Sequence, residues 1–253
     1  MSWLASLPLI LFLVVFFYAP FAVLAYYSVQ TDHGLGFDNY LALVTDRTYI
    51  MVAAKSLLLA GEVTVATLLL SLPLVIYISV HASSRERTAI LGLVIIPFWI
   101  DVLLRAIALR TVLESIGVRE GYAAMLAGMV YEMLPLMILP MYASSRRVTR
   151  SIIDAARTAG AGWGTVVARI VLPLLAPGIV AGSLLVMLMS LTEFVIPALL
   201  GGVSGFTLGS LIYHVFLSSG LWGVGAALTV VVVLVLGIMS AVAASRVGGG
   251  LEP

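Results

Sequence analysis

Long apolar runs are the feature that most constrains how this chain folds. A helix that crosses the hydrocarbon core of a bilayer needs about 20 mostly apolar residues, and the sequence holds about six such runs. Of the 253 residues, 62% are hydrophobic and 10% are charged, whereas soluble domains carry about 25% charged residues. The composition therefore predicts an integral membrane protein. The predicted spans are residues 4–29, 56–80, 89–109, 122–143, 174–200 and 221–244.

The expected fold class is all-α, with six transmembrane helices. Backbone polar groups cannot stay unpaired in hydrocarbon, and the runs lack the alternation of membrane-barrel strands. The first run has no basic segment before it, which favours a retained span over a cleaved signal peptide. No room is left for a separate soluble domain, so residues 1–253 are predicted to form a single transmembrane domain. The spacing Gly178-x3-Gly182 predicts close helix packing.

Prolines and arginines refine this prediction. Prolines within the spans predict kinks or breaks in the helices. Arginine concentrates in cytoplasmic connectors, and the connectors after the second and fourth spans hold most of the arginines. Both chain termini are therefore predicted to lie in the cytoplasm. The arginines that support this orientation are Arg85, Arg87, Arg146, Arg147, Arg150, Arg157, Arg169 and Arg246.

Several classes of function are excluded by what the sequence lacks. There is no cysteine, which rules out disulfides and thiolate-bound metals. The net charge of +1 provides no basic face for nucleic acid. His81 and His214 have no second ligand at useful spacing, so no metal site is predicted. The single lysine, Lys55, follows Ala54 rather than a glycine-rich loop, so this chain is not expected to bind ATP itself.

A polar, arginine-bearing segment separates the fourth and fifth predicted spans. Ser151 and Asp154 fit a capping box, which predicts a short helix. Gly160 interrupts that helix, because glycine permits the positive φ of a sharp turn. Residues 165–172 predict a second short helix, and Pro173 is expected to begin the fifth span. Such a pair is either a rigid knob that meets a cytoplasmic partner or a loop that lies on the lipid headgroups.

Charged residues inside the spans are costly and usually face a bundle interior or a water-filled path. Asp101 and Arg105 are four residues apart, which predicts a pair that either fixes one helix or places Asp101 at the mouth of a path. Glu193 precedes Phe194, and a carboxylate beside an aromatic ring suits a cationic amine; a structural contact between spans is the alternative. Glu132 either lines a cavity or makes a hydrogen bond between helices.

Two connectors and two further charges complete the sequence-based predictions. Residues 30–49 are expected to form an ordinary external loop. Residues 201–220 are rich in glycine but also apolar, which favours a re-entrant or interfacial stretch. Lys55 and Glu62 lie two turns apart on one helix face, so each is expected to pair with another span.

The spacing Asp154-Ala155-Ala156-x3-Gly160-x9-Ile170-x-Leu172-Pro173 resembles the EAA coupling motif of permeases of binding-protein-dependent ABC transporters. Asp154 stands where that motif usually has glutamate. The resemblance extends to the spermidine/putrescine type of permease, and more to the first of its two permease subunits than to the second. The stretches that carry it are residues 97–99 with Arg105, 134–142, 173–179 and 193–202.

This resemblance implies a type I ABC importer permease fold with cytoplasmic coupling helices in residues 151–173. It also implies a prokaryotic inner-membrane location and three partners: ATPase subunits that bind the ATP, a second permease subunit and an extracytoplasmic solute-binding protein. The chain itself is then not an enzyme and holds no cofactor. The implied coupling residues are Asp154, Ala155, Ala156, Gly160, Ile170, Leu172 and Pro173. The candidate substrate path consists of Glu193, Asp101, Arg105, Glu132 and Phe194.

The expected substrate is a small organic cation such as a polyamine, with an anion or a metal complex as the alternative. A secondary transporter would also have acids and broken helices at mid-membrane, but it would leave the segment before Pro173 without a purpose. An intramembrane protease is disfavoured, because Ser204 and His214 lie in one connector rather than on facing helices.

Overall fold

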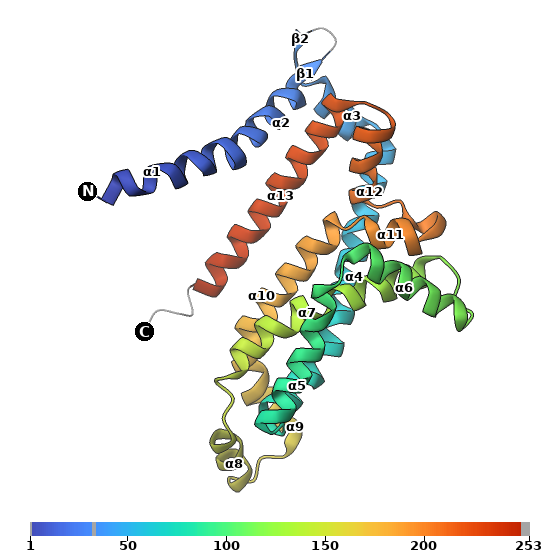
Figure 1. Cartoon of the computed structure of the whole chain (residues 1–253). Coiled ribbons are helices and arrows are strands. Elements are labelled where there is room, and N and C mark those ends of the chain that lie inside the picture. Colours follow the sequence, from blue (N-terminus) through green and yellow to red (C-terminus); the bar gives the residue numbers. More distant parts are fainter. Residues whose placement is uncertain (1, 32–33, 249–253) are drawn as a thin grey trace. The chain divides into compact units, whose positions relative to one another are not determined.

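The computed structural model describes residues 2–31 and 34–248. They form two compact units, Met1–Ala53 with Leu211–Ile238 and Ala54–Ser210 with Met239–Pro253. The candidate site residues all lie in the second unit (Figure 1). Whether the chain acts as one transmembrane domain remains a prediction.

The first unit begins with an apolar helix that contains a π-helical turn. Pro20 has no N–H for the ordinary helical bond to the carbonyl group four residues earlier, and the helix widens just before it. The connector predicted as a loop is in fact a short antiparallel hairpin followed by a helix. The elements are α1 (Ser2–Leu13), η1 (Val14–Tyr18), α2 (Ala19–Val29), β1 (Gln30–Thr31), β2 (Gly34–Leu35), α3 (Asp38–Thr45), η5 (His214–Ser218) and α13 (Trp222–Gly248).

Three helices run from one unit into the other. Asp46 precedes the first of them, α4 (Arg47–Val80), and accepts a hydrogen bond of 2.8 Å from the backbone N–H of Thr48. This bond holds the pKa of the Asp46 carboxyl below its ordinary value. The other two are α12 (Leu208–Tyr213) and α13, whose last residues belong to the second unit.

The second unit contains the remaining helices, some long and some short. Its elements are α5 (Ser84–Ile95), η2 (Ile96–Trp99), α6 (Val102–Ser115), α7 (Tyr122–Ser145), α8 (Arg150–Thr158), α9 (Trp163–Val166), η3 (Val167–Val171), α10 (Leu172–Thr192), α11 (Val195–Leu200) and η4 (Gly202–Gly205).

Within the described residues, 5 helices are long and apolar enough to cross a membrane, and a bent pair brings the number to 6. The predicted number of spans is therefore confirmed when the bent pair counts as one span. The third span, predicted over residues 89–109, is broken, because the chain turns by 106° between Trp99 and Val102; the predicted kink or break at a proline within a span is confirmed here. Pro97 lies in the tight 3₁₀ turn that ends the first half. The five long helices are Ile10–Val29, Arg47–Val80, Tyr122–Ser145, Trp163–Thr192 and Trp222–Val242.

The core of the second unit lies where α7 packs against α10 (Figure 1). A Cβ atom on Gly178 would lie 2.5 Å from the carbonyl oxygen of Pro140, and one on Gly182 would lie 2.9 Å from the sulfur of Met137. Only glycine permits this approach, so the predicted close packing is confirmed. On α7 a buried methionine faces the core at each turn: Met125, Met129, Met133, Met137 and Met141.

The amino-terminal half of α4 is tied to the segment that follows α11. Lys55 donates a hydrogen bond of 2.9 Å to the carbonyl oxygen of Ser204, and the Ser56 hydroxyl accepts one of 2.7 Å from the N–H of Leu208. Glu62 accepts a hydrogen bond from the Tyr122 hydroxyl at the start of α7. The predicted contact with another span is confirmed for Glu62, whereas Lys55 contacts a carbonyl group of the connector turn η4 (Gly202–Gly205) instead. The apolar helix Leu208–Ser218 is too short to cross a bilayer, as expected of a re-entrant or interfacial stretch.

Candidate functional site

The coupling segment, residues 150–173, begins with a helix that ends in a glycine turn. At the end of α8, the N–H of Gly160 donates to the carbonyl of Arg157 at 2.9 Å, and the N–H of Ala161 donates to that of Ala156 at 3.0 Å. These two bonds form a Schellman motif, whose closing residue needs a positive φ. Gly160 has a φ of +87°, so the predicted glycine turn is confirmed.

The predicted capping box at Ser151 is wrong. The helix α8 starts earlier, at Arg150, with Thr149 as its N-cap and no capping hydrogen bond from a side chain. Ser151 therefore lies inside the first turn, where its hydroxyl cannot cap. Asp154 and Ala155 are exposed on this helix, whereas Ile153 is buried against the rest of the unit. The helix thus packs through one face and presents small and acidic side chains on the other.

The second predicted short helix is not a separate element. Trp163–Thr192 is one long helix that passes through the π-helical turn η3. Pro173 lacks an N–H, and the turn widens just before it, as it does before Pro20. Ile170 lies in this turn, and Leu172 begins α10. The end of the coupling segment is therefore continuous with the long helix.

Arg150 ties the coupling segment to a second long helix. Its Nε donates to the carbonyl oxygen of Val80 at 3.2 Å, and its Nη2 donates to that of His81 at 3.4 Å. These carbonyls close the carboxyl end of α4, where helices leave acceptors unpaired and favour cations. The His81 ring also meets the Trp163 ring edge-on at 5.7 Å. A cavity of about 330 Å³ opens between Arg150, Asp154 and these rings.

Sequence reasoning missed this connection. From the sequence, Arg150 is only evidence of orientation, and His81 is considered only as a metal ligand. No periodicity or motif links these two positions, because they are 69 residues apart and meet only in the folded unit.

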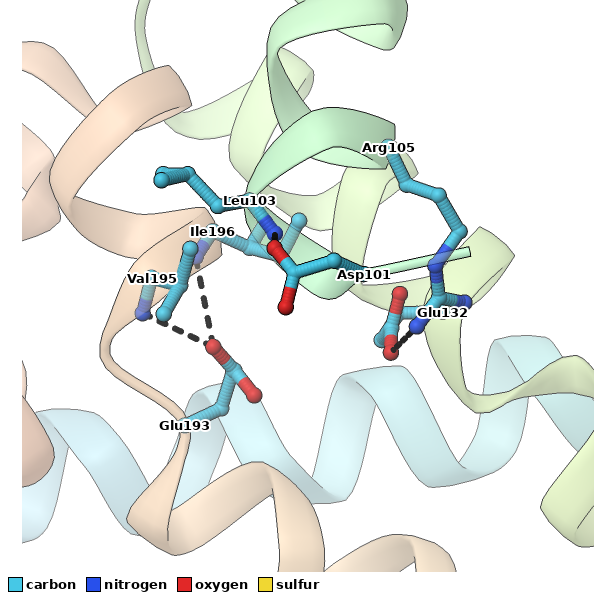
Figure 2. Close-up of polar contacts among 7 residues, drawn as sticks. All are labelled: Asp101, Leu103, Arg105, Glu132, Glu193, Val195 and Ile196. Carbon is cyan, nitrogen blue, oxygen red and sulfur yellow. Dashed lines mark hydrogen bonds and ion pairs between the residues drawn. The ribbon is translucent and has the colours of Figure 1, made fainter. Parts of the chain in front are cut away.

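The charged residues of the bent third span form a different pair from the one predicted. Arg105 donates through Nη2 to Glu132 Oε1 of α7 at 2.7 Å, and both residues are buried (Figure 2). The predicted pair of Asp101 with Arg105 is wrong, because the two residues do not share a continuous helix face. Asp101 stands in the break and caps α6, accepting from the N–H of Leu103 at 2.9 Å. The Arg105 guanidinium also lies 5.8 Å from the centre of the Phe98 ring.

Glu193 occupies the corresponding position at a second helix break. The fifth span ends at Thr192 rather than at Leu200 as predicted, and α11 starts at Val195, after a break of two residues. Glu193 Oε1 accepts from the N–H of Val195 at 2.8 Å and from that of Ile196 at 3.3 Å (Figure 2). The carboxylate thus caps a helix start, where its negative charge is stabilised by the helix dipole.

The structure brings the predicted path residues together from four elements. The helices α6 and α11 pack on one another, and Glu193 lies close enough to Glu132 for the two carboxylates to repel. Phe194 follows Glu193 in the same helix break, and this residue is 41% exposed. Figure 2 draws these residues together: Arg105 is paired with Glu132, and the carboxylates of Asp101 and Glu193 each lie at the start of a helix.

This arrangement can hold a positively charged group. Within the described residues, no group of three histidine, cysteine or acidic side chains is placed to hold a metal ion. Nothing at the site resembles a nucleophile with its base: Ser204 lies in η4, and its carbonyl accepts from Lys55.

Comparison with known proteins places this geometry in a family. The family described as "Binding-protein-dependent transport system inner membrane component" matches residues 63–248. The chain is 32% identical over 219 residues to the spermidine/putrescine transport system permease protein PotB of Escherichia coli (strain K12), covering 80% of this chain and 79% of that protein. It is 31% identical over 220 residues to PotB of Haemophilus influenzae, covering 80% of this chain and 76% of that protein.

Solved structures show the same fold at low sequence identity. A bacterial ABC transporter involved in the import of the acidic polysaccharide alginate matches with a TM-score of 0.79 at 17% identity, covering 99% of this chain and 96% of that chain. The MetNI methionine ABC transporter matches with a TM-score of 0.61 at 15% identity, covering 80% of this chain and 96% of that chain. The predicted type I ABC importer permease fold is confirmed. With a family match over most of its length, this chain belongs to the binding-protein-dependent transport system inner membrane components.

Proposed function

We propose that this chain is a permease subunit of an ATP-driven importer that moves a polyamine-like organic cation into the cytoplasm. The observation that carries the proposal is the 32% identity to spermidine/putrescine permeases over 80% of the chain. The cluster of Asp101, Glu132 and Glu193 supports it independently, since intramembrane acids mark cation pathways.

Asp154, Ala155, Ala156 and Gly160 form the surface on which an ATPase subunit docks. Their helix is tied to the end of α4 through Arg150, and residues 163–192 continue into α10. Movement of the ATPase pair is thereby transmitted to two long helices at once. The solute path opens alternately to either side, because the two conformations differ in their contacts with the ATPase.

The remaining parts of the system follow from the same proposal. A binding protein delivers the solute on the extracytoplasmic side, and a second permease subunit supplies the other half of the path. The ATPase subunits bind the ATP, and this chain contributes no cofactor site. Both termini lie in the cytoplasm of a prokaryote; terminal residues 1 and 249–253 lie outside the described residues.

A second candidate substrate class is an anion. Arg105 is a buried cation within the path, and a guanidinium is a good partner for carboxylates and phosphates. Acidic side chains outnumber Arg105 at the site, which favours a cationic substrate over an anionic one.

Reconstitution tests the proposal. The permease pair, its ATPase and its binding protein are placed in proteoliposomes, and entry of radiolabelled spermidine is followed with and without ATP. We expect uptake that requires ATP and the binding protein and that excess putrescine inhibits. Uptake that persists without ATP would indicate a secondary transporter. Uptake of an acidic oligosaccharide or phosphate in place of spermidine would favour the anion alternative.

A further inference from the structure

We propose that Arg105 occupies the place on Glu132 that an ammonium group of the substrate takes during transport. In this view the structure shows a cation site that is filled by the protein's own side chain. The inference rests on the proposed function, because it requires that an organic cation passes through this unit.

The surroundings of the Arg105 guanidinium are those of an organic-cation site. It lies 2.7 Å from a Glu132 oxygen and 5.8 Å from the centre of the Phe98 ring. A carboxylate combined with an aromatic face is the arrangement by which proteins hold ammonium and guanidinium groups. Arg105 is 8% exposed and Glu132 is 9% exposed, so the contact is largely desolvated and correspondingly strong.

The Arg105–Glu132 pair lacks some of the hydrogen bonds expected of a buried ion pair whose only role is to stabilise the fold. Buried pairs of that kind require that their remaining donors and acceptors are also satisfied. Here Arg105 Nε and Glu132 Oε2 are buried and have no hydrogen-bond partner. Arginine and carboxylate often meet through two parallel bonds, but a single bond joins these two. Glu132 thus keeps one oxygen for a second donor, and Arg105 can leave by breaking one bond.

The charge of the region also calls for a further cation. Asp101 and Glu193 each use one carboxylate oxygen as a helix cap, and neither is paired with a basic side chain in the part of the chain that the structure describes. Three carboxylates thus come from α7 and from the starts of α6 and α11, which pack on one another, and one of them, that of Glu132, is paired with a guanidinium. Exchange of Arg105 for a substrate that carries several ammonium groups would neutralise more of this charge.

The site also lies where the chain can change conformation. Asp101 and Glu193 stand at the two helix breaks of this unit, and transporters place their binding sites at such interruptions. Arg105 is in the first turn of α6, directly after its break, so movement of α6 relative to α7 would withdraw the guanidinium from Glu132. Arg105 would then return when the substrate leaves, which aids release.

The test is direct binding of radiolabelled spermidine to the purified permease–ATPase complex without its binding protein. If Arg105 occupies Glu132 in about nine of ten molecules, Arg105→Gln should bind spermidine about tenfold more tightly than the unmodified complex. Glu132→Gln should bind about tenfold more weakly. The double variant should behave like Glu132→Gln alone, because the acceptor is missing in both.

A purely structural ion pair gives the opposite pattern. Arg105→Gln and Glu132→Gln would then both destabilise the complex, the double variant would restore its stability, and no variant would gain affinity. Arg110→Gln is the matched control, because it breaks exposed pairs with Glu114 and Glu120 and should leave binding unchanged. Thermal unfolding in detergent checks assembly. Should Arg105→Gln fail to assemble, Arg105→Lys is measured instead, with an expected gain of about threefold.

Failure of this inference is distinguishable from failure of the proposed function. If the unmodified complex imports spermidine and neither Arg105 variant binds it more tightly, only the self-occupied site is overturned. If the unmodified complex imports no spermidine, the proposed function itself is overturned.

Discussion

The coupling segment and the charge cluster are built in opposite ways. The coupling segment is contiguous, its turn is made by hydrogen bonds between neighbours such as Gly160 and Arg157, and much of α8 is exposed. The charge cluster draws Arg105, Glu132 and Glu193 from residues far apart in the sequence and buries the first two. The surface proposed to meet a partner is thus encoded locally, whereas the groups proposed to meet the solute are assembled by packing.

The same comparison separates two kinds of charge. Arg150 closes the end of α4, and Asp101 and Glu193 cap helix starts, so each has its charge stabilised by a helix end. Among the described residues, Arg105 is instead paired with Glu132 and lies beside the Phe98 ring. Loss of a charge should therefore have different consequences for the two kinds of charge.

The largest effect is expected at the glycine turn. Gly160→Pro should reduce transport to background while the protein still inserts into the membrane. Proline requires a φ of about −65° and has no N–H, whereas Gly160 has a φ of +87° and donates to Arg157. Uptake in proteoliposomes and copurification of the ATPase measure the effect. Gly162→Ala is the control, because that residue has a φ of −69° and open space around its Cα. Normal uptake by Gly160→Pro would refute the coupling role.

A smaller loss is expected in the charge cluster. Glu193→Gln keeps an oxygen that accepts from Val195 but removes the negative charge, so the helix start should persist. We expect spermidine uptake to fall about tenfold, which corresponds to about 1.4 kcal/mol of lost attraction. Assembly of the complex should change little. Glu114→Gln, an exposed acid on α6, is the matched control. Unchanged uptake would remove Glu193 from the solute path.

The smallest effect is expected where the coupling segment is joined to α4. Arg150→Gln removes the bonds to the end of α4 but leaves the glycine turn intact. We expect uptake to fall about fivefold, since a hydrogen bond contributes about 1 kcal/mol net. ATP hydrolysis should fall less than uptake, so the ratio of solute moved to ATP used decreases. Arg147→Gln, at an exposed arginine in the turn that precedes α8, should leave that ratio unchanged. An equal fall of both rates would count against transmission through α4.

The sequence by itself determined the features that depend on near neighbours. Apolar length predicted the number of spans, Gly160 predicted the sharp turn, and Gly178 and Gly182 predicted close packing. Each follows from a property of a few consecutive residues: burial of apolar side chains, a positive φ, or the absence of a Cβ atom.

Only the tertiary structure decided how the charges are paired. Helical spacing predicted an ion pair between Asp101 and Arg105. Because the chain bends by 106° at this point, Asp101 caps α6, and Arg105 pairs with Glu132 of another helix. Likewise the bond from Arg150 to the end of α4 joins positions that no local pattern connects. A buried charge pairs with the partner that helix packing brings close to it. In hydrocarbon, the free-energy cost of an unpaired charge exceeds the free energy that a contact with a sequence neighbour contributes.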